Sequence, residues 1–187
     1  MDGHEAADLE EIVAWVTSGE PLYRVASPAT PPRHLVVYIA LLDEAARSLL
    51  LVDQVKAGCW LLPGGHVEPD EDPACAVVRE AREELGVDVV FNDRLGGQDG
   101  FFVTQTQTRG AGTHTDVTVW FVVEGDHRMR VVPDPGEFRG TGWYSLDEPI
   151  RWESDSFDPQ MHRFIAKVRH ATVAAVDLTE SPVESTY

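Results

Sequence analysis

The sequence predicts one α/β domain in which a mixed β-sheet lies between helical layers. Apolar segments typical of strands recur along the chain, and residues 35–42 (LVVYIALL) are almost continuously apolar, as expected for a strand covered on both faces. Amphipathic helical patterns interrupt these strands at residues 73–85 and follow them at residues 159–173. The length of 187 residues suits one domain with a substantial core.

The N-terminal third is expected to contain one helix and two strands. Apolar residues recur at helical spacing in residues 5–17, which predicts an amphipathic helix. Residues 18–32 contain four prolines and are expected to connect this helix to the sheet with little regular structure. The strand at residues 35–42 should continue through a turn at 43–47 into a second strand at 48–52.

Local signals set both ends of the helix predicted at residues 73–85. Asp72 can accept hydrogen bonds from free amides, Pro73 suits the first helical position, and Gly86 favours termination. Five apolar residues form one stripe: Ala74, Val77, Val78, Ala81 and Leu85. Three glutamates lie away from it: Glu80, Glu83 and Glu84. One face is therefore expected to be core and the other a carboxylate cluster.

The remaining segments complete the predicted sheet and its second helical layer. They are strands at 87–91 and 100–107, a loop at 109–115, a long strand at 116–124, a loop from 131 into a last strand at 142–145, and the helix at 159–173. The expected organisation is an N-terminal helix and connector at 1–33, a folded domain at 34–176, and a frayed tail at 177–187.

The carboxylate cluster is unfavourable as a simple exposed face. Like charges three and four residues apart on a helix each cost about 0.2–0.5 kcal/mol, and carboxylates near a helix C-terminus oppose its dipole. Arg79 and Arg82 offset this cost only in part. A hard divalent cation, which prefers oxygen ligands, would explain the crowding; a solvated acidic face is the alternative.

The spacing around these glutamates resembles the motif of the Nudix hydrolases. Gly65 is followed after five residues by Glu71, and after seven more by the segment 79–87, REAREELGV. In that family the motif is a loop, helix and loop that holds magnesium or manganese against a substrate diphosphate. The resemblance implies the Nudix-type α/β/α sandwich, here with an added N-terminal helix and a C-terminal helix.

Roles inside the motif follow from the resemblance, position by position. Glu80, Glu83 and Glu84 match the metal-binding positions, and Gly65 matches the loop glycine, whose backbone is a further candidate ligand. Arg79 matches the arginine that orients the glutamates, and Glu71 serves the loop. Arg79, Glu83 and Glu84 are thus the motif's candidate catalytic residues. A carboxylate acting with the metal would activate the attacking water.

Four residues outside the motif are weaker candidates. Glu137 precedes the last strand and could supply a supporting catalytic carboxylate; an exposed loop glutamate is the alternative. His114 and Asp116 could contact substrate, although fixing a turn is the more common role of such residues. Trp60 could stack on a substrate ring or pack in the core. Cys59 is expected to be a small buried residue.

The resemblance implies a metal-dependent hydrolase that cleaves the diphosphate linkage of a nucleoside diphosphate joined to another group. A nucleoside triphosphate and a nucleotide sugar or alcohol both remain open, because residues 100–104 (GFFVT) lack the proline and tyrosine that mark two substrate classes of the family. One alternative is a non-catalytic Nudix-fold regulator, although the motif is intact. The other is an isopentenyl-diphosphate-type isomerase, although Cys59 lies outside the required motif.

Composition limits the partners. The formal net charge of −17 disfavours binding to nucleic acid or to an anionic membrane, and makes a cation bridge to a phosphorylated small molecule more necessary. Two cysteines are too few for a disulfide framework, and no signal peptide or long apolar span is evident. A cytoplasmic protein is expected, with a homodimer as an open alternative to a monomer.

Overall fold

The computed structural model describes residues 1–26, 30–108 and 113–179, with side chains up to residue 173. The described residues contain three α-helices, two short 3₁₀ helices and one seven-stranded sheet. In chain order the elements are α1 (Gly3–Ser18), β1 (Arg33–Asp43), β2 (Ser48–Gln54), β3 (Cys59–Leu61), β4 (Gly64–His66), α2 (Pro73–Leu85), η1 (Asp93–Leu95), η2 (Gly97–Asp99), β5 (Phe102–Gln107), β6 (Thr115–Glu124), β7 (Phe138–Ser145) and α3 (Met161–Thr179).

Strand β1 is the centre of the sheet, and its two edges are used differently. Along one edge β6 pairs with it in parallel over its length, and β5 pairs antiparallel with β6. The other edge is shared, because β4 pairs antiparallel with residues 36–38 whereas β2 pairs only with Leu42 and Asp43. Strand β2 in turn pairs antiparallel with β3 and with β7. One parallel pair among antiparallel pairs makes the sheet mixed, as predicted.

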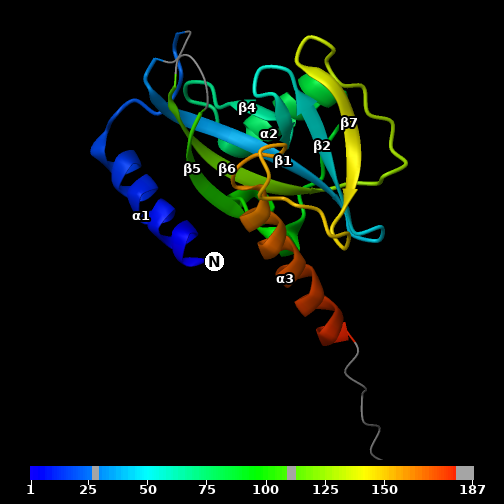
Figure 1. Cartoon of the computed structure of the whole chain (residues 1–187). Helices are drawn as coiled ribbons and strands as arrows, with labels where there is room; N and C mark the ends of the chain where they lie inside the picture. Colours follow the sequence, from blue (N-terminus) through cyan, green and yellow to red (C-terminus); the bar gives the residue numbers. More distant parts are fainter. Residues whose placement is uncertain (27–29, 109–112, 180–187) are drawn as a thin grey trace, which may run out of the picture.

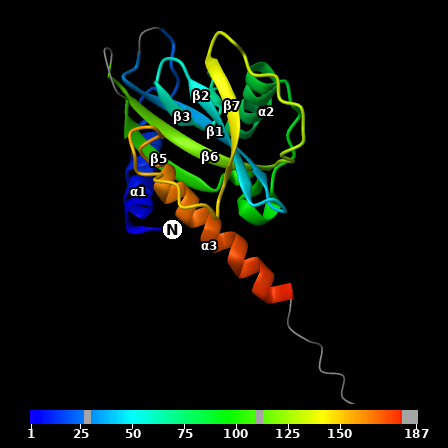
Figure 2. The same cartoon turned by 45° about the vertical axis from the view of Figure 1, so that its right-hand side comes forward.

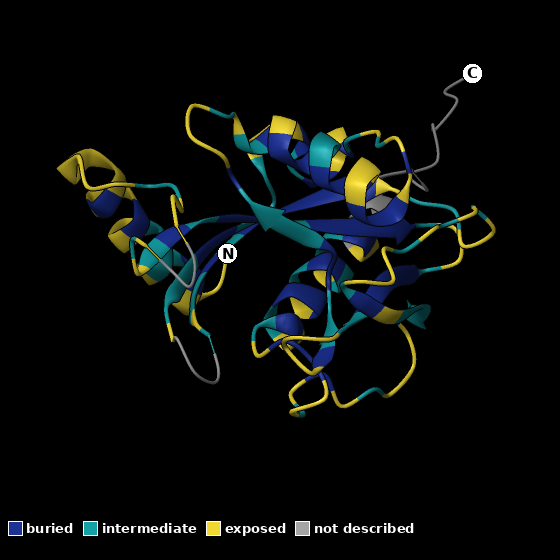
Figure 3. Cartoon of the chain, turned by 90° about the horizontal axis from the view of Figure 1, so that it is seen from above, coloured by how far each residue is buried: buried dark blue, intermediate teal, exposed yellow. Residues whose placement is uncertain are grey.

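Helices cover both faces of the sheet (Figures 1 and 2). Successive side chains of a strand point to opposite faces, so Ile39 and Leu41 of β1 pack in the cluster that includes α2. Ala40 and Leu42 pack in the cluster that includes α3. Figure 3 shows largely buried strands between helices that turn exposed residues outward. The predicted α/β/α sandwich with terminal helices is confirmed.

Helix α2 has the predicted limits, and its end groups explain them. The Asp72 carboxylate accepts a hydrogen bond from the amide of Ala74 at 2.8 Å, and Pro73 occupies the first turn. Gly86 ends the helix with φ 67°, a left-handed conformation that glycine adopts without strain. Its amide donates to carbonyls of the last turn. Helix α2 therefore holds its glutamates at a fixed place against β1 and β4.

Three predicted elements differ from the structure. Residues 87–91 do not form a strand: among them only Phe91 makes a bridge, to Val123, before the chain turns into η1. Strand β7 begins at Phe138 rather than at residue 142, because its first residues pair with the end of β2. Helix α3 runs from Met161 to Thr179, which is longer than predicted. The rest of the predicted tail, residues 180–187, lies outside the described residues.

Helix α1 lies beside β5 and is tied to α3 (Figure 1). Ile12 and Trp15 bury their side chains against Val117 of β6. Arg163 of α3 donates to the Asp2 carboxylate at 2.9 and 3.0 Å, and Lys167 donates to Glu5 at 2.6 Å. Within the described residues, none of the helices has the length and apolar character needed to span a bilayer.

Candidate active site

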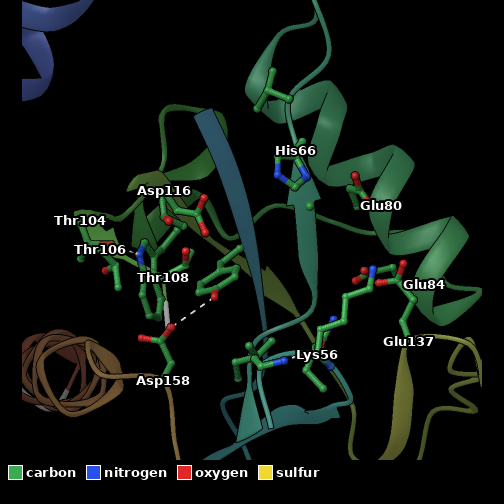
Figure 4. Close-up of a pocket in the computed structure, with 18 of the residues that line it drawn as sticks. Lys56, His66, Glu80, Glu84, Thr104, Thr106, Thr108, Asp116, Glu137 and Asp158 are labelled. Carbon is green, nitrogen blue, oxygen red and sulfur yellow. Dashed lines mark hydrogen bonds between the residues drawn. The ribbon is translucent and has the colours of Figure 1, made fainter. Parts of the chain in front are cut away.

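A cavity of about 640 Å³ opens where the partners of β1 change from β4 to β2. Figure 4 shows glutamates from α2 on one side and threonines and aspartates on the other. Eight of the predicted site residues line this cavity: Gly65, Arg79, Glu80, Glu83, Glu84, His114, Asp116 and Glu137. The fold thus brings together residues that lie far apart in the sequence.

The two glycines of β4 allow the glutamates of α2 to approach the strand closely. The amide of Gly64 donates to the Glu84 carboxylate at 2.7 Å. A Cβ atom at Gly65 would lie only 2.3 Å from Oε1 of Glu80, so any larger residue would displace this carboxylate. Glycine at position 65 is therefore required by the position of Glu80.

Arg79 connects the loop of the motif to the carboxylate cluster. Its guanidinium makes two hydrogen bonds of 2.9 Å to Glu71, which itself accepts from the amide of Glu68. It also donates to Glu80 at 2.7 Å, to Glu83 at 3.3 Å and to the carbonyl oxygen of His66 at 2.9 Å. One side chain thus fixes both the loop and two of the three glutamates.

The surroundings of Glu80 and Glu84 disfavour the negatively charged form of their carboxyl groups. Burial raises the pKa of Glu84 to about 8, and the nearby carboxylates of Glu80 and Glu137 add to this effect. Burial also raises the pKa of Glu80, although Arg79 counteracts the increase. Glu80 and Glu84 are only 9% and 7% exposed, so the solvated acidic face is wrong for these two residues; the side chain of Glu83 is 62% exposed.

Glu137 reaches the cluster because its loop is fastened to the end of α2. The amides of Val132 and Asp134 donate to the carbonyls of Leu85 and Glu84, each at 2.9 Å. The Glu137 carbonyl accepts from the amide of Val55, which ties the loop to the end of β2. The carboxylate of Glu137 lies next to that of Glu84 (Figure 4).

The opposite wall contains polar residues that the sequence did not reveal. Tyr38 of β1 donates its hydroxyl to Asp158 at 3.2 Å, and Thr104 of β5 accepts from the indole nitrogen of Trp120 at 3.0 Å. Thr106 and Thr108 continue this wall, and Lys56 lies at the side nearest Glu84 (Figure 4). Thr104, Thr106 and Thr108 alternate with other residues along the chain, whereas the contacts of Tyr38 and Trp120 join residues far apart in the sequence.

Three histidines and an aspartate meet where β1, β4 and β6 converge. His34 lies opposite Asp116 in the parallel register, and His114 precedes Asp116 by two residues. Oδ1 of Asp116 is 3.3 Å from Nε2 of His34 and 3.2 Å from Nε2 of His114. Nε2 of His66 is 3.1 Å from Nε2 of His34. His34 and His66 are additions to the predicted site.

Trp60 and Cys59 occupy neighbouring positions with different surroundings. Trp60 is not among the described residues that line the cavity. Its ring is partly buried and packs edge-on against Tyr144 at 5.3 Å, beside the cluster that includes α3, which favours core packing over the alternative of a substrate contact. Cys59 is buried, as expected, and lines the cavity.

The carboxylate cluster fits a hard divalent cation. Glu80, Glu83 and Glu84 offer oxygen donors on one side of the cavity, with Glu137 beside them. Burial, with the neighbouring carboxylates of Glu80 and Glu137 in addition, raises the pKa of Glu84 and so disfavours its negative charge. A bound cation would favour the charged form of these carboxylates.

Comparisons with known proteins identify the family. A family model described as NUDIX domain matches residues 32–168. A CTP pyrophosphohydrolase of Escherichia coli (strain K12) is 27% identical over 137 residues, covering 71% of this chain and 93% of that protein. An RNA pyrophosphohydrolase of Pseudomonas putida (strain GB-1) is 27% identical over 120 residues, covering 59% and 76%.

A solved structure agrees in fold. The MutT NUDIX hydrolase from Burkholderia pseudomallei has a TM-score of 0.55 and 22% identity, over 73% of this chain and 98% of that chain. The family model covers well over half of the chain, in the same region that forms the sheet, α2 and the cavity. The chain therefore belongs to the NUDIX domain family.

Proposed function

We propose that this Nudix-type diphosphohydrolase cleaves a nucleoside triphosphate, or a nucleotide joined through a diphosphate to a sugar or alcohol, with Mg²⁺ or Mn²⁺ as cofactor. The observation that carries the proposal is the pair of buried carboxylates, Glu80 and Glu84, at one side of a nucleotide-sized cavity, where burial and neighbouring carboxylates raise the pKa of both. Such a pair attracts a cation, and a cation attracts a diphosphate.

The proposed cation ligands are Glu80, Glu83 and Glu84, with the backbone of Gly65 as a further ligand. When bound, the cation neutralises phosphate charge and lowers the pKa of water. Arg79 keeps Glu80 and Glu83 aligned through its hydrogen bonds. Glu83, Glu84 and Glu137 are the candidate groups that take the proton of the attacking water, because their carboxylates line the same part of the cavity.

The opposite wall is the proposed binding site for the rest of the substrate. Thr106 offers a hydroxyl group, and Asp158, which accepts a hydrogen bond from the Tyr38 hydroxyl, offers a carboxylate acceptor at a fixed position. His114 and Asp116 line the same wall and are proposed to contact substrate. CTP is a suitable first substrate to test, because the relative named CTP pyrophosphohydrolase aligns over 93% of its own length.

The domain division and the cellular setting stay predictions. The proposed division is a helix and connector at 1–33, the catalytic domain at 34–176 and a tail at 177–187. The proposed partner is a small phosphorylated molecule rather than nucleic acid or membrane, in keeping with the net charge of −17. A cytoplasmic location and a homodimer also remain to be tested.

Glu84→Gln tests the carboxylate site. The amide keeps the shape of the side chain but is a poorer partner for a hard cation, so turnover should fall by at least a hundredfold. The measurement is release of phosphate or pyrophosphate from a panel of nucleoside triphosphates and nucleotide sugars with magnesium. Glu153→Gln, at an exposed site, is the matched control and should keep full activity.

Two results would contradict the proposal. Full turnover in excess chelator would exclude a required divalent ion. Unchanged turnover of Glu84→Gln would remove this residue from the site. Tight binding of a nucleotide without any hydrolysis would instead favour the regulatory alternative.

A further inference from the structure

We propose that His34, His114 and Asp116 form a separate binding site for a zinc-like transition-metal ion, with His66 as a fourth ligand. The site lies where β1, β4 and β6 converge, and all but the buried His34 line the cavity described above. It is distinct from the glutamates of α2, because its donors are mainly imidazole nitrogens. A bound ion would replace the direct substrate contact proposed above for His114 and Asp116.

The backbone fixes these side chains before any ion binds. His34 and Asp116 are directly opposed in the parallel pairing of β1 and β6. His114 and Asp116 are two residues apart, a spacing that places side chains on the same side of an extended chain. His66 is aligned with Val36 of β1 through β4, two residues along from His34. Little conformational entropy would therefore be lost on binding.

The distances match those between ligands of a small tetrahedral ion. Zinc bonds to nitrogen and oxygen of ~2.0–2.1 Å place adjacent ligand atoms roughly 3.3 Å apart. Three contacts here have this length: Asp116 to His34 at 3.3 Å, Asp116 to His114 at 3.2 Å, and His66 to His34 at 3.1 Å. The donor atoms of His34, His114 and Asp116 all lie within 4.8 Å of one another. Small rotations of the rings would complete the site.

The hydrogen bond made by one ring nitrogen of His34 shows which of its two nitrogens could bind a metal ion. Nδ1 of His34 lies 3.0 Å from the carbonyl oxygen of Pro31, and a carbonyl can only accept, so Nδ1 carries the proton. In the neutral ring Nε2 then carries a lone pair, and it faces both Nε2 of His66 at 3.1 Å and Oδ1 of Asp116 at 3.3 Å. A backbone carbonyl that fixes the tautomer in this way is typical of metal-binding histidines.

The buried oxygen of Asp116 lacks the hydrogen-bond donor that a buried carboxylate oxygen needs. Oδ1 of Asp116 is buried and has no hydrogen-bond partner among the described residues, yet it lies near the Nε2 atoms of His34 and His114. A metal ion would satisfy the carboxylate oxygen and the lone pair of His34 together. Two or three imidazoles with one carboxylate select zinc, cobalt or nickel over magnesium, which prefers oxygen ligands.

Equilibrium dialysis of the metal-free full-length chain against Zn²⁺ in excess Mg²⁺ tests this site. We expect one zinc to remain bound, since magnesium competes poorly for imidazole. His114→Gln and Asp116→Asn should weaken zinc binding at least tenfold. Co²⁺ should show the visible spectrum of a tetrahedral ion in the original protein and lose it in both variants.

Two controls separate this site from other acidic and histidine clusters. His127→Gln removes a histidine from the exposed group Asp43, Asp126 and His127, and should leave zinc binding unchanged. Glu83→Gln alters the glutamate cluster and should also retain the zinc, whether or not the chain proves to be a hydrolase. Thermal melting in chelator establishes that each variant is folded.

Absence of bound zinc in the original protein would overturn the proposal. Zinc binding that persists unchanged in both His114→Gln and Asp116→Asn, or that is lost in His127→Gln or Glu83→Gln, would place the ion elsewhere. If His114→Gln or Asp116→Asn does not fold, the cobalt spectrum of the original protein decides, because an octahedral spectrum excludes this geometry.

Discussion

Gly65 shows how one missing side chain can define a site. In Gly65→Ala the new methyl would collide with the flexible end of Glu80, 2.3 Å away, rather than with backbone. The carboxylate can turn aside at small cost in stability, but it then leaves the cluster. We expect turnover to fall at least tenfold with little change in melting temperature.

A glycine in an open environment provides the control for this substitution. Gly140→Ala in β7 adds a methyl with no atom within 4 Å, so activity and melting temperature should both be unchanged. Equal activity of Gly65→Ala and the original protein would show that the position of Glu80 is unimportant for turnover.

Arg79 contributes both to the stability of the domain and to the alignment of the carboxylate cluster. Arg79→Ala removes hydrogen bonds to Glu71, Glu80, Glu83 and the His66 carbonyl. Charged hydrogen bonds of this kind contribute about 1.5–3 kcal/mol, so the free energy of unfolding should fall by about that amount. The magnesium concentration for half-maximal turnover should rise, because Glu80 and Glu83 are no longer aligned.

Magnesium titrations of turnover, together with urea unfolding in chelator, measure both effects. Arg82→Ala is the matched control, since Arg82 pairs only with exposed Asp88 among the described residues and lies away from the cavity. If both variants have the same magnesium requirement, Arg79 does not align the carboxylates.

Residue-level prediction succeeded where chemistry is encoded locally. The spacing of Glu80, Glu83 and Glu84 identified a carboxylate cluster without any structural information. Tyr38, Asp158 and His34 could not be predicted, because strand pairing and α3 bring them to the cavity from distant positions. For Trp60 the side-chain type left substrate stacking and core packing both open, and its edge-on contact with Tyr144 favours core packing.

At the scale of elements, prediction depended on whether the ends carried local signals. Helix α2 was predicted residue for residue, because Asp72, Pro73 and Gly86 determine its ends. Strand β4 was missed, because two glycines and a histidine give no alternating pattern and become a strand only by pairing with β1. Residues 87–91 show the reverse error, since an apolar pattern without a neighbouring strand forms only one bridge.

Helix α1 offers a test of whether the N-terminal element belongs to the cooperative unit. Trp15 is 3% exposed. The guanidinium carbon of Arg33 lies over its ring, 4.6 Å from the centre of that ring. Truncating a buried tryptophan costs about 3–5 kcal/mol, so Trp15→Ala should lower the unfolding free energy by about 3 kcal/mol. Urea denaturation followed by circular dichroism measures the change.

Val16 on the same helix is the matched control. Its side chain is 46% exposed, and Val16→Ala should change stability by no more than about 0.5 kcal/mol. Equal stability of the two variants would show that α1 unfolds separately from the domain.

At the scale of the whole molecule, the surplus of negative charge makes cation binding and folding depend on each other. The chain carries a formal charge of −17, and its buried carboxylates lie in the cavity where the proposed cation binds. A ligand that binds only the folded state stabilises it by mass action. The cation should therefore have a larger effect on stability at a pH where the cluster would otherwise be charged.

The raised pKa of Glu84 gives that dependence a sign. The pKa of Glu84 is raised to about 8 in the folded protein by burial, so its protonated form favours folding below about pH 4.5 and this contribution is lost as the pH rises towards 8. His66 acts oppositely, because burial lowers its pKa to about 4 and its contribution grows only up to about pH 6.5.

Between pH 6.5 and 8 the Glu84 effect remains, and the melting temperature in chelator should fall. In Glu84→Gln the fall should be smaller, and magnesium should raise the melting temperature of the original protein more at pH 8 than at pH 6.5. Thermal melts at these two pH values, with chelator or magnesium, measure all three effects; equal slopes for the two proteins in chelator would mean that Glu84 is already ionised in the folded state.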